Sequence, residues 1–371
     1  MVNSVIRVAM TMSGGVDSSV AAALLKEQGY AVTGVTMKIW GGKAAAEAPV
    51  HHGCYGPGEE EDIEDAGRVA QQLDIPFHVL DLTGEYRSEV LDYFSREYLS
   101  GRTPNPCVRC NHNIKFGALI EKSRQSGLQF DAIASGHYAR VEYDAQQSRY
   151  ILKKAKDLTK DQSYFLSFLS QKQLAQLILP LGGYTKTEVR AMAKRFGLHI
   201  AAKPDSQNFV CGDYTSLIQT EPAPGPILDE SGHLLGQHQG IQFYTIGQRK
   251  GLGLSMQMPL YVTAIDPARN TVAVGPKEEL YKDEFNVSNL NWIAISEINH
   301  PLELNVKIRS SQKDAQAIVT PLDSGNVRVN LKEAQMAIAP GQSAVFYQDE
   351  VVVGGGIIEW INSSYCKGIV K

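Results

Sequence analysis

The chain has 371 residues, which predicts two or three domains rather than a single core. Charged residues make up 20% of it and hydrophobic residues 43%, and the formal net charge is −4. This is an ordinary globular composition, and it excludes the strong overall basic charge of many nucleic-acid-binding proteins. Five cysteines scattered over so large a chain exclude a disulfide framework, and no apolar run is long enough to span a membrane. We therefore expect a cytoplasmic protein, with any nucleic-acid contact confined to local basic patches.

The first half of the chain alternates predicted strands and helices. The predicted strands cover residues 5–10, 31–37, 77–82 and 131–135, and the predicted helices cover 20–27, 61–74, 85–99 and 113–126. This alternation indicates an α/β domain with a parallel sheet covered on both faces. Ligands then belong at the carboxyl ends of the strands.

The second half of the chain changes in character. Residues 164–197 have a helical pattern, with Leu174, Leu177 and Ile178 expected on one face. Beyond a proline-rich linker at 222–226 the chain is β-rich, which predicts small antiparallel barrels. Predicted strands lie at 260–265, 306–309 and 343–347, and a break near 286 divides this half. Three domains are expected. Residues 1–204 form the α/β domain, residues 205–285 form a small central domain, and residues 286–371 form a C-terminal antiparallel β-barrel.

The run Ser13-Gly14-Gly15-Val16-Asp17-Ser18-Ser19 follows the first strand and opens the first helix. A glycine-rich turn at this place directs backbone N–H groups and the helix dipole at an anion. The serines add hydroxyl donors, and Asp17 is suited to hold a Mg²⁺ ion on bound phosphates. The run has neither the lysine of a Walker A loop nor the spacing of a dinucleotide-binding turn. It resembles the PP-loop of the ATP pyrophosphatases, which adenylate a carbonyl oxygen.

A second motif is Pro104-Asn105-Pro106-Cys107-Val108-Arg109-Cys110-Asn111. We expect it to place Cys110 at a helix N-terminus, where the dipole, Arg109 and Lys115 would stabilise a thiolate. Such thiolates are nucleophiles or metal ligands. A further cysteine, Cys211, lies in an Asp205-Ser206 loop, where a buried core cysteine is the commoner outcome.

Taken together, these motifs closely resemble those of the tRNA-uridine 2-sulfurtransferase family, the tRNA 2-thiouridylases. The resemblance runs nearly end to end through ordered motifs: 13–19, 104–111, 114–116, 135–138, 160–166, 205–211, 236–240, 245–253 and 340–347. It implies adenylation of the 2-oxygen of the wobble uridine of certain tRNAs by ATP with Mg²⁺. Sulfur transfer then yields 2-thiouridine, AMP and pyrophosphate.

The resemblance also assigns roles to residues. Cys211 carries a persulfide supplied by a sulfur-relay protein or another sulfide source, and Cys110 releases the sulfur and ends in a disulfide with Cys211. The implied ATP-binding residues are Thr11, Met12, Ser13, Gly14, Gly15, Val16, Asp17, Ser18, Met37 and Gly136. The implied tRNA-binding residues are Asn105, Pro106, Cys107, His137, Lys160, Asp161, Gln162, Arg309, Ser310 and Gln342.

One position departs from the family pattern, because Cys107 replaces the usual aspartate. The change creates Cys107-x-x-Cys110, which with Cys211 gives three soft thiolates. Related tRNA thiolases hold a 4Fe–4S cluster with three cysteines. A cluster therefore stands as one interpretation, and a persulfide enzyme in which Cys107 is a spectator stands as the other, which we favour.

Several features keep simpler explanations open. The basic residues Lys153, Lys154 and Lys156 are suited to track phosphates or to sit on a solvated surface, and Asp161 is expected to cap a helix near 163. His51, His52 and Cys54 lie in a glycine-rich segment, 41–60, which we expect to be a mobile solvated loop rather than a metal site. Cys366 is given no role.

Two other functions compete with tRNA thiolation. A PP-loop ligase or amidotransferase acting on a small molecule would need neither the thiols nor the barrel. A non-catalytic tRNA-binding protein would not need the intact PP-loop.

Overall fold

The computed structural model describes residues 5–42, 53–204, 208–210, 214–218 and 220–359. The chain forms two compact units. The first contains residues 1–90, 106–214 and 350–352, and the second contains 91–105, 215–349 and 353–371. Within the described residues, no helix is both long and apolar enough to cross a membrane.

The first unit is built on a five-stranded parallel sheet. Its strands are β1 (Arg7–Thr11), β2 (Ala31–Lys38), β4 (Phe77–Asp81), β5 (Ala132–Ala134) and β8 (Leu177–Ile178). Their order is β4-β2-β1-β5-β8, and each neighbouring pair is parallel. The chain thus reverses its direction of travel across the sheet between β1 and β5, and loops leaving these strands diverge there to leave a ligand crevice. The predicted parallel sheet is confirmed.

Leu177 and Ile178 correct one prediction, because they belong to a strand and not to a helix. They pair with Ile133 and Ala134 of β5 at the edge of the sheet. Their spacing from Leu174 imitates helical periodicity, but α7 (Gln171–Leu174) ends before them. A two-residue apolar run is too short for its periodicity to separate a helix from a strand.

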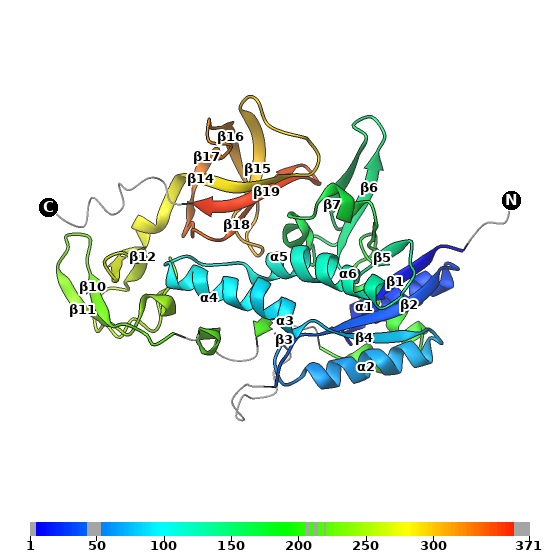
Figure 1. The fold of residues 1–371 in the computed structure, drawn as a ribbon. Coiled ribbons are helices and arrows are strands. Elements are labelled where there is room, and N and C mark those ends of the chain that lie inside the picture. Colours follow the sequence, from blue (N-terminus) through cyan, green and yellow to red (C-terminus); the bar gives the residue numbers. More distant parts are fainter. Residues whose placement is uncertain (1–4, 43–52, 205–207, 211–213, 219, 360–371) are drawn as a thin grey trace. The chain divides into compact units, whose positions relative to one another are not determined.

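Three helices cover one face of this sheet. They are α1 (Val16–Glu27), α2 (Glu59–Gln72) and α8 (Lys186–Arg195). Their apolar sides share one buried core with Val8 and Met10 of β1, and Figure 1 shows α2 extended along the sheet beside β4. A capping box between Thr185 and Glu188 begins α8, because each side chain accepts the other residue's backbone N–H.

The predicted helices 85–99 and 113–126 are each assembled from several pieces. The first consists of α3 (Thr83–Tyr86), a π-helix at Arg87–Leu91 and α4 (Asp92–Leu99). The second begins earlier than predicted, with α5 (Pro106–Arg109), continues as the π-helix η2 (Cys110–Ala118) and ends as α6 (Leu119–Gln125). Two π-helices in one small region are unusual, and such segments are often found at functional sites.

Two small strand pairs complete the described part of the first unit. A hairpin of β6 (Ala139–Asp144) and β7 (Arg149–Lys154) comes after β5 in the chain, and it was not predicted. The strand β3 (Gly53–Tyr55) pairs in parallel with β9 (Asn208–Val210). The loop prediction for 41–60 is therefore wrong at residues 53–55, and also at 59–60, where α2 begins. Short 3₁₀-helices lie at Ser163–Leu166, His199–Ala202 and Tyr214–Leu217.

The second unit is β-rich and contains two sheets. The smaller has the order β11-β10-β13-β12, with β10 (Gly225–Leu228), β11 (Leu234–His238), β12 (Tyr261–Asp266) and β13 (Thr271–Gly275). It is accompanied by 3₁₀-helices at Ile241–Phe243 and Lys277–Leu280.

The larger sheet closes into the predicted C-terminal antiparallel barrel. Its strands follow the order β14-β17-β16-β15-β18-β19, and β14 also pairs with β19. They are β14 (Tyr281–Trp292), β15 (Leu302–Lys307), β16 (Ala315–Pro321), β17 (Val327–Met336), β18 (Ser343–Gln348) and β19 (Val351–Glu359). The barrel interior is filled by aliphatic and aromatic side chains, so it is a packed core and no channel. β14 passes through residue 286 without interruption (Figure 1).

Candidate active site

The loop between β1 and α1 has the backbone of an anion-binding site. Gly14 has φ +68°, and a Cβ atom there would lie 2.1 Å from the backbone oxygen of Asp62, so only glycine fits. Gly15 is the N-cap of α1, and no side chain caps that helix end. The N–H groups of the first turn and the helix dipole are therefore directed at whatever occupies the loop.

The serines of this loop hold its shape. The Ser18 hydroxyl accepts a hydrogen bond from the N–H of Ser13 and donates one to the carbonyl of Gly15, each at 3.2 Å. Ser19 is fully buried, and its hydroxyl donates to the same carbonyl at 2.8 Å. The prediction that Ser19 is a donor to phosphate is therefore wrong, because its hydroxyl is used inside the helix.

Asp17 is bonded to a lysine that sequence reasoning missed. Both of its carboxylate oxygens accept hydrogen bonds from the Lys186 ammonium at 2.8 Å, and one also accepts from the Tyr138 hydroxyl at 2.8 Å. Lys186 is the first residue of α8, which packs against α1. The capping box at Thr185 was a readable signal for the start of α8, although the sequence could not show which loop this helix faces. The pair places a cation beside the anion-binding loop.

Residues that follow neighbouring strands complete the crevice. A Cβ atom at Gly136, which follows β5, would lie 2.7 Å from the backbone nitrogen of Ser18, so β5 and the loop meet closely. The Thr11 hydroxyl donates to the carbonyl of Ala134 at 3.1 Å and ties β1 to β5. Met37 lies half-buried near the end of β2. Met12 is buried at 2% exposure, so its side chain belongs to the core.

Three cysteines come together in the first unit. Cys107 lies in α5 and Cys110 opens η2, and both interact electrostatically with Cys54 of β3. Their exposure is graded, because Cys54 is exposed, Cys107 is intermediate and Cys110 is buried. Cys54 was not predicted here, since nothing in its local sequence connects β3 to the 104–111 loop.

The expected low-pKa thiolates are contradicted by the surroundings of these thiols. Burial raises the pKa of Cys110 to about 11 and that of Cys107 to about 12, and the neighbouring thiols add to both effects. Cys110 lies four residues beyond the start of α5 at Pro106, so it is not at a free helix end. Arg109 forms an ion pair with Glu89 at 2.9 Å.

Lys115 is the cation of this cluster. Burial lowers its pKa, but interaction with Cys110, Cys54 and Cys107 outweighs burial, and the net shift is upward. The Lys115 charge in turn lowers the pKa of Cys107 and of Cys110, which opposes the larger effect of burial. Lys115 lies five residues after Cys110, and the π-helix, with its i→i+5 hydrogen bonds, brings residues at this spacing one turn apart.

His137 adjoins the same cluster. Burial, with the Lys115 charge as a second cause, lowers its pKa to about 3, so the ring is neutral at physiological pH. Its Nδ1 lies 2.5 Å from the Ser135 hydroxyl, and its ring packs on Phe116 at 5.9 Å between centroids. The site therefore joins a neutral imidazole, a lysine and thiols in a largely dehydrated setting.

A metal centre finds no support among the described side chains. Within residues 5–42, 53–204, 208–210, 214–218 and 220–359, no three His, Cys, Asp or Glu side chains are arranged to hold an ion. The expected third ligand, Cys211, lies outside the described residues, as do His51, His52 and Cys366. Cys107 and Cys110 alone give two thiols, which is one fewer than the expected ligand set.

Several predicted RNA contacts in the first unit have structural partners. Asp161 accepts hydrogen bonds from the N–H groups of Ala155 at 3.0 Å and of Ser163, the first residue of a 3₁₀-helix, at 3.2 Å. The N-cap of that helix is Gln162, so the cap lies one residue later than predicted. Gln162 accepts from the N–H of Tyr138 at 2.9 Å. Lys160, next to them, is half-buried.

The basic residues before this segment are largely paired. Lys153 contacts Glu142 at 2.7 Å and Glu350 at 3.5 Å, and Lys156 contacts Glu188 at 3.2 Å. These carboxylates reduce the positive potential that a run of three lysines suggests.

The remaining predicted RNA contacts belong to the second unit. Gln342 donates to the carbonyls of Thr103 and Pro104 at 3.1 Å each, which holds the segment before Asn105 and Pro106. Arg309 donates to the carbonyl of Ala337 at 2.8 Å, and Ser310 is exposed.

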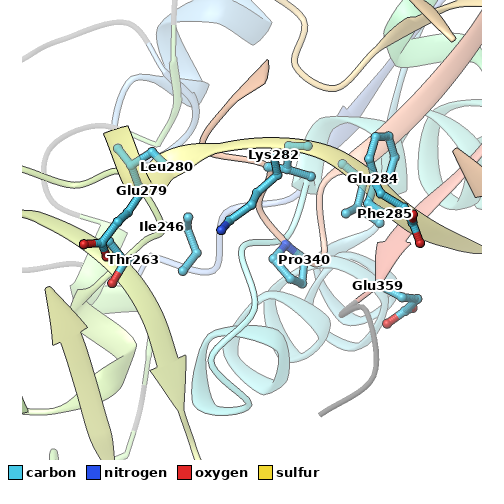
Figure 2. Close-up of a pocket in the computed structure, with 11 residues that line it drawn as sticks. Ile246, Thr263, Glu279, Leu280, Lys282, Glu284, Phe285, Pro340 and Glu359 are labelled. Carbon is cyan, nitrogen blue, oxygen red and sulfur yellow. The ribbon is translucent and has the colours of Figure 1, made fainter. Parts of the chain in front are cut away.

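A cavity in the second unit is a separate feature. It holds about 50 Å³ and is lined by Glu279, Glu284, Glu359 and Lys282 together with apolar side chains (Figure 2). Burial and the neighbouring Glu230 carboxylate, to which a protonated Glu279 can donate a hydrogen bond, raise the pKa of Glu279 to about 7. Ligand pockets usually hold several hundred Å³, so this one is too small for a nucleotide.

The doubly wound sheet and the loop at its reversal point define a nucleotide-binding α/β protein of the PP-loop class. Models of known protein families match almost the whole chain. Family models described as tRNA methyl transferase HUP domain, tRNA methyl transferase PRC-barrel domain and aminomethyltransferase beta-barrel domain match residues 6–211, 216–276 and 282–358.

Individual relatives show the same extent of similarity. The tRNA-specific 2-thiouridylase MnmA of Endomicrobium trichonymphae is 48% identical over 355 residues, covering 95% of this chain and 98% of the relative. The same-named protein of Moorella thermoacetica is 48% identical over 358 residues, covering 94% and 98%. That of Acetivibrio thermocellus is 45% identical over 361 residues, covering 95% and 99%. The chain belongs to the family of the tRNA-specific 2-thiouridylases.

Proposed function

We propose that this protein is a tRNA-uridine 2-sulfurtransferase. It uses ATP to adenylate the 2-oxygen of the wobble uridine and then replaces that oxygen with sulfur, giving 2-thiouridine, AMP and pyrophosphate. The observation that carries the proposal is the similarity to 2-thiouridylases at 45–48% identity over about 95% of the chain. The expected division into 1–204, 205–285 and 286–371 remains part of the proposal, with its last boundary inside β14.

The phosphate loop supports the adenylation step. Gly14, Gly15 and the first turn of α1 present N–H groups to the triphosphate, and Gly136 lets β5 approach the same loop. A urea-like carbonyl is a poor electrophile, and its oxygen is a poor leaving group. Adenylation changes the leaving group to AMP, so a sulfur nucleophile can displace it.

The Asp17–Lys186 pair bears on the expected Mg²⁺. The carboxylate is a suitable ligand for that ion, and Lys186 occupies both of its oxygens. We propose that Lys186 turns to the phosphates when Asp17 takes the ion. The Asp17–Lys186 ion pair is then broken, and both Mg²⁺ and Lys186 lie at the triphosphate.

The thiols support the sulfur transfer. Cys110 is proposed as the thiol that releases sulfur to the activated uridine and ends in a disulfide with Cys211, the persulfide carrier loaded by a sulfur-relay protein. A 4Fe–4S cluster on Cys107, Cys110 and Cys211 is the alternative for the same step. We retain the persulfide route as the proposal, because it needs only Cys110 and Cys211 and gives Cys107 no bond to sulfur.

The tRNA contacts are proposed for residues of both units. Asn105, Pro106 and Cys107 belong to the motif that contains Cys110, His137 interacts with Lys115, and Lys160 follows the basic run. Arg309, Ser310 and Gln342 are the proposed contacts in the barrel unit. Asp161 and Gln162 act by holding the backbone beside these residues.

An assay of AMP release with and without tRNA, together with nucleoside mass spectrometry of the tRNA, tests the proposal. The wild type should release AMP only with tRNA and should form 2-thiouridine when a persulfide donor is present. Asp17→Ala should lose both products while its tRNA affinity stays within a few-fold, and Cys110→Ser should lose only 2-thiouridine. ATP–pyrophosphate exchange without tRNA would identify a small-molecule ligase, and tRNA binding with no AMP release would identify a binding protein.

A further inference from the structure

Cys54 is the accessible thiol of the cysteine cluster. It is exposed, whereas Cys107 is intermediate and Cys110 keeps only 8% of its surface accessible. Electrostatic interaction joins Cys54 to both of these thiols and to Lys115. An external reagent can reach Cys54 directly, while Cys110 is reached only after the surrounding groups move aside.

Cys54 is held in place by regular structure. In the parallel pair of β3 and β9, Gly53 is opposite Asn208 and Tyr55 is opposite Val210. The Tyr55 ring stacks on Tyr86 with centroids 5.4 Å apart and planes 12° apart, and Tyr86 is 1% exposed. Cys54 is thus fixed from both sides, which a solvated loop would not provide. The residue that follows β9 in the sequence is Cys211.

We propose that Cys54 is a further catalytic residue, the thiol that first accepts sulfur from an external persulfide donor and passes it inward. The inference rests on the proposed sulfurtransferase function and adds a loading step to it. The exposure gradient supplies the direction of transfer, from the accessible thiol to the buried one. Lys115 supplies a positive charge for the anionic sulfur species formed along the way.

The loading step is a redox-neutral exchange. The Cys54 thiolate attacks the terminal sulfur of a donor persulfide, R–S–SH. The donor S–S bond breaks as the new S–S bond forms on Cys54, and the donor leaves as a thiolate that takes up a proton. A second exchange of the same kind moves the terminal sulfur to a neighbouring cysteine and returns Cys54 to its thiol form.

The test follows the sulfur atom. Full-length protein is mixed with glutathione persulfide carrying ³⁵S in its terminal position, quenched with an alkylating reagent over a time course and digested with trypsin. Cleavage after Arg68, Arg102, Arg109 and Lys115 places Cys54, Cys107 and Cys110 on separate peptides. We expect label on the Cys54 peptide first, decaying as 2-thiouridine appears. Label that enters another cysteine peptide without ever appearing on the Cys54 peptide would overturn the proposal.

Variants test the same step without relying on the time course. Cys54→Ser should lower ³⁵S loading and 2-thiouridine formation at least tenfold while tRNA-dependent AMP release stays within twofold. Cys366→Ser, at a cysteine without an assigned role, should match the wild type in all three. Wild-type loading and thiolation rates in Cys54→Ser would refute the inference. A wild type that forms neither AMP nor 2-thiouridine would instead refute the function on which it rests.

Discussion

The phosphate loop and the thiol cluster lie in the same unit but are constructed in different ways. The phosphate loop is one continuous run, 13–19, and its anion site consists largely of backbone N–H groups. The cluster draws Cys54, Cys107, Cys110 and His137 from segments far apart in the chain. Binding a phosphate needs one turn of suitable shape, whereas delivering a sulfur atom needs groups that only tertiary packing can bring together.

The two regions also handle charge in opposite ways. At the phosphate loop, Asp17 and Lys186 form an ion pair at 2.8 Å, so each has a partner to exchange when a ligand arrives. At the cluster, burial keeps Cys107, Cys110 and His137 uncharged and leaves Lys115 as the cation among them. The first region is prepared for a polyanion, and the second is prepared to stabilise one anion as it forms.

The largest effect expected at the phosphate end is that of Lys186→Met. This change removes the cation beside Asp17 and the charge that we assign to the phosphates, so AMP release should fall by about 10²-fold or more. The control is Lys194→Met, an exposed position on the same helix, which should be neutral. Equal activity of the two variants would show that the ion pair has no part in adenylation.

Gly136→Ala tests how closely the end of β5 must approach the phosphate loop. The added Cβ would lie 2.7 Å from the backbone nitrogen of Ser18, so the loop must shift. A shift approaching an ångström should reduce AMP release by roughly 10–100-fold. A methyl group added at Gly183 would have nothing within 4 Å, so Gly183→Ala is the matched control and should retain full activity.

At the cluster, His137→Gln should change how stability depends on pH. The folded pKa of His137 is about 3, below its ordinary 6.5. The unfolded chain therefore gains a proton below pH 6.5 that the folded state does not, and stability falls as the pH decreases from about 6.5 toward 3. From pH 7 to pH 5 this one group should cost about 2 kcal/mol.

Urea unfolding at the two pH values measures this difference. The loss of stability between pH 7 and pH 5 should be smaller by that amount in His137→Gln than in the wild type. The exposed His78→Gln variant should behave as the wild type does. Identical pH dependence in all three proteins would mean that folding does not change the pKa of His137.

The smallest effect is expected for Cys107→Asp. The new carboxylate would interact with the Lys115 charge, as the Cys107 thiol does. In the persulfide route this position forms no bond to sulfur, so thiolation should stay within about threefold of the wild type. Nucleoside mass spectrometry and iron analysis of anaerobically purified protein provide the measurement. Activity that follows an iron content of about four atoms per chain, lost in Cys107→Ala, would reverse the choice between the two sulfur routes.

The sequence predicted the phosphate loop better than it predicted the thiol cluster. The parallel sheet, the loop at 13–19 and the C-terminal barrel depend on local periodicity and turn chemistry, and they were predicted. Lys186 and Cys54 were missed, because their importance lies in which distant residues they face. The thiol pKa values were predicted in the wrong direction, since a helix terminus can be read from a motif while the burial that outweighs it cannot.

The π-helix at Cys110–Ala118 has a consequence for anyone who would stabilise this protein by design. At the 3.6 residues per turn of an ordinary α-helix, Lys115 would lie about 140° around the axis from Cys110. The wider turn of the π-helix makes this angle much smaller and keeps Lys115 near the Cys110 thiol. The backbone of a π-helix is less favourable than that of an α-helix. Substitutions that regularise these nine residues should therefore raise the melting temperature and lower the catalytic rate together. A consensus-based stabilisation programme is best kept away from this segment, where heat resistance and chemistry would be selected in opposite directions.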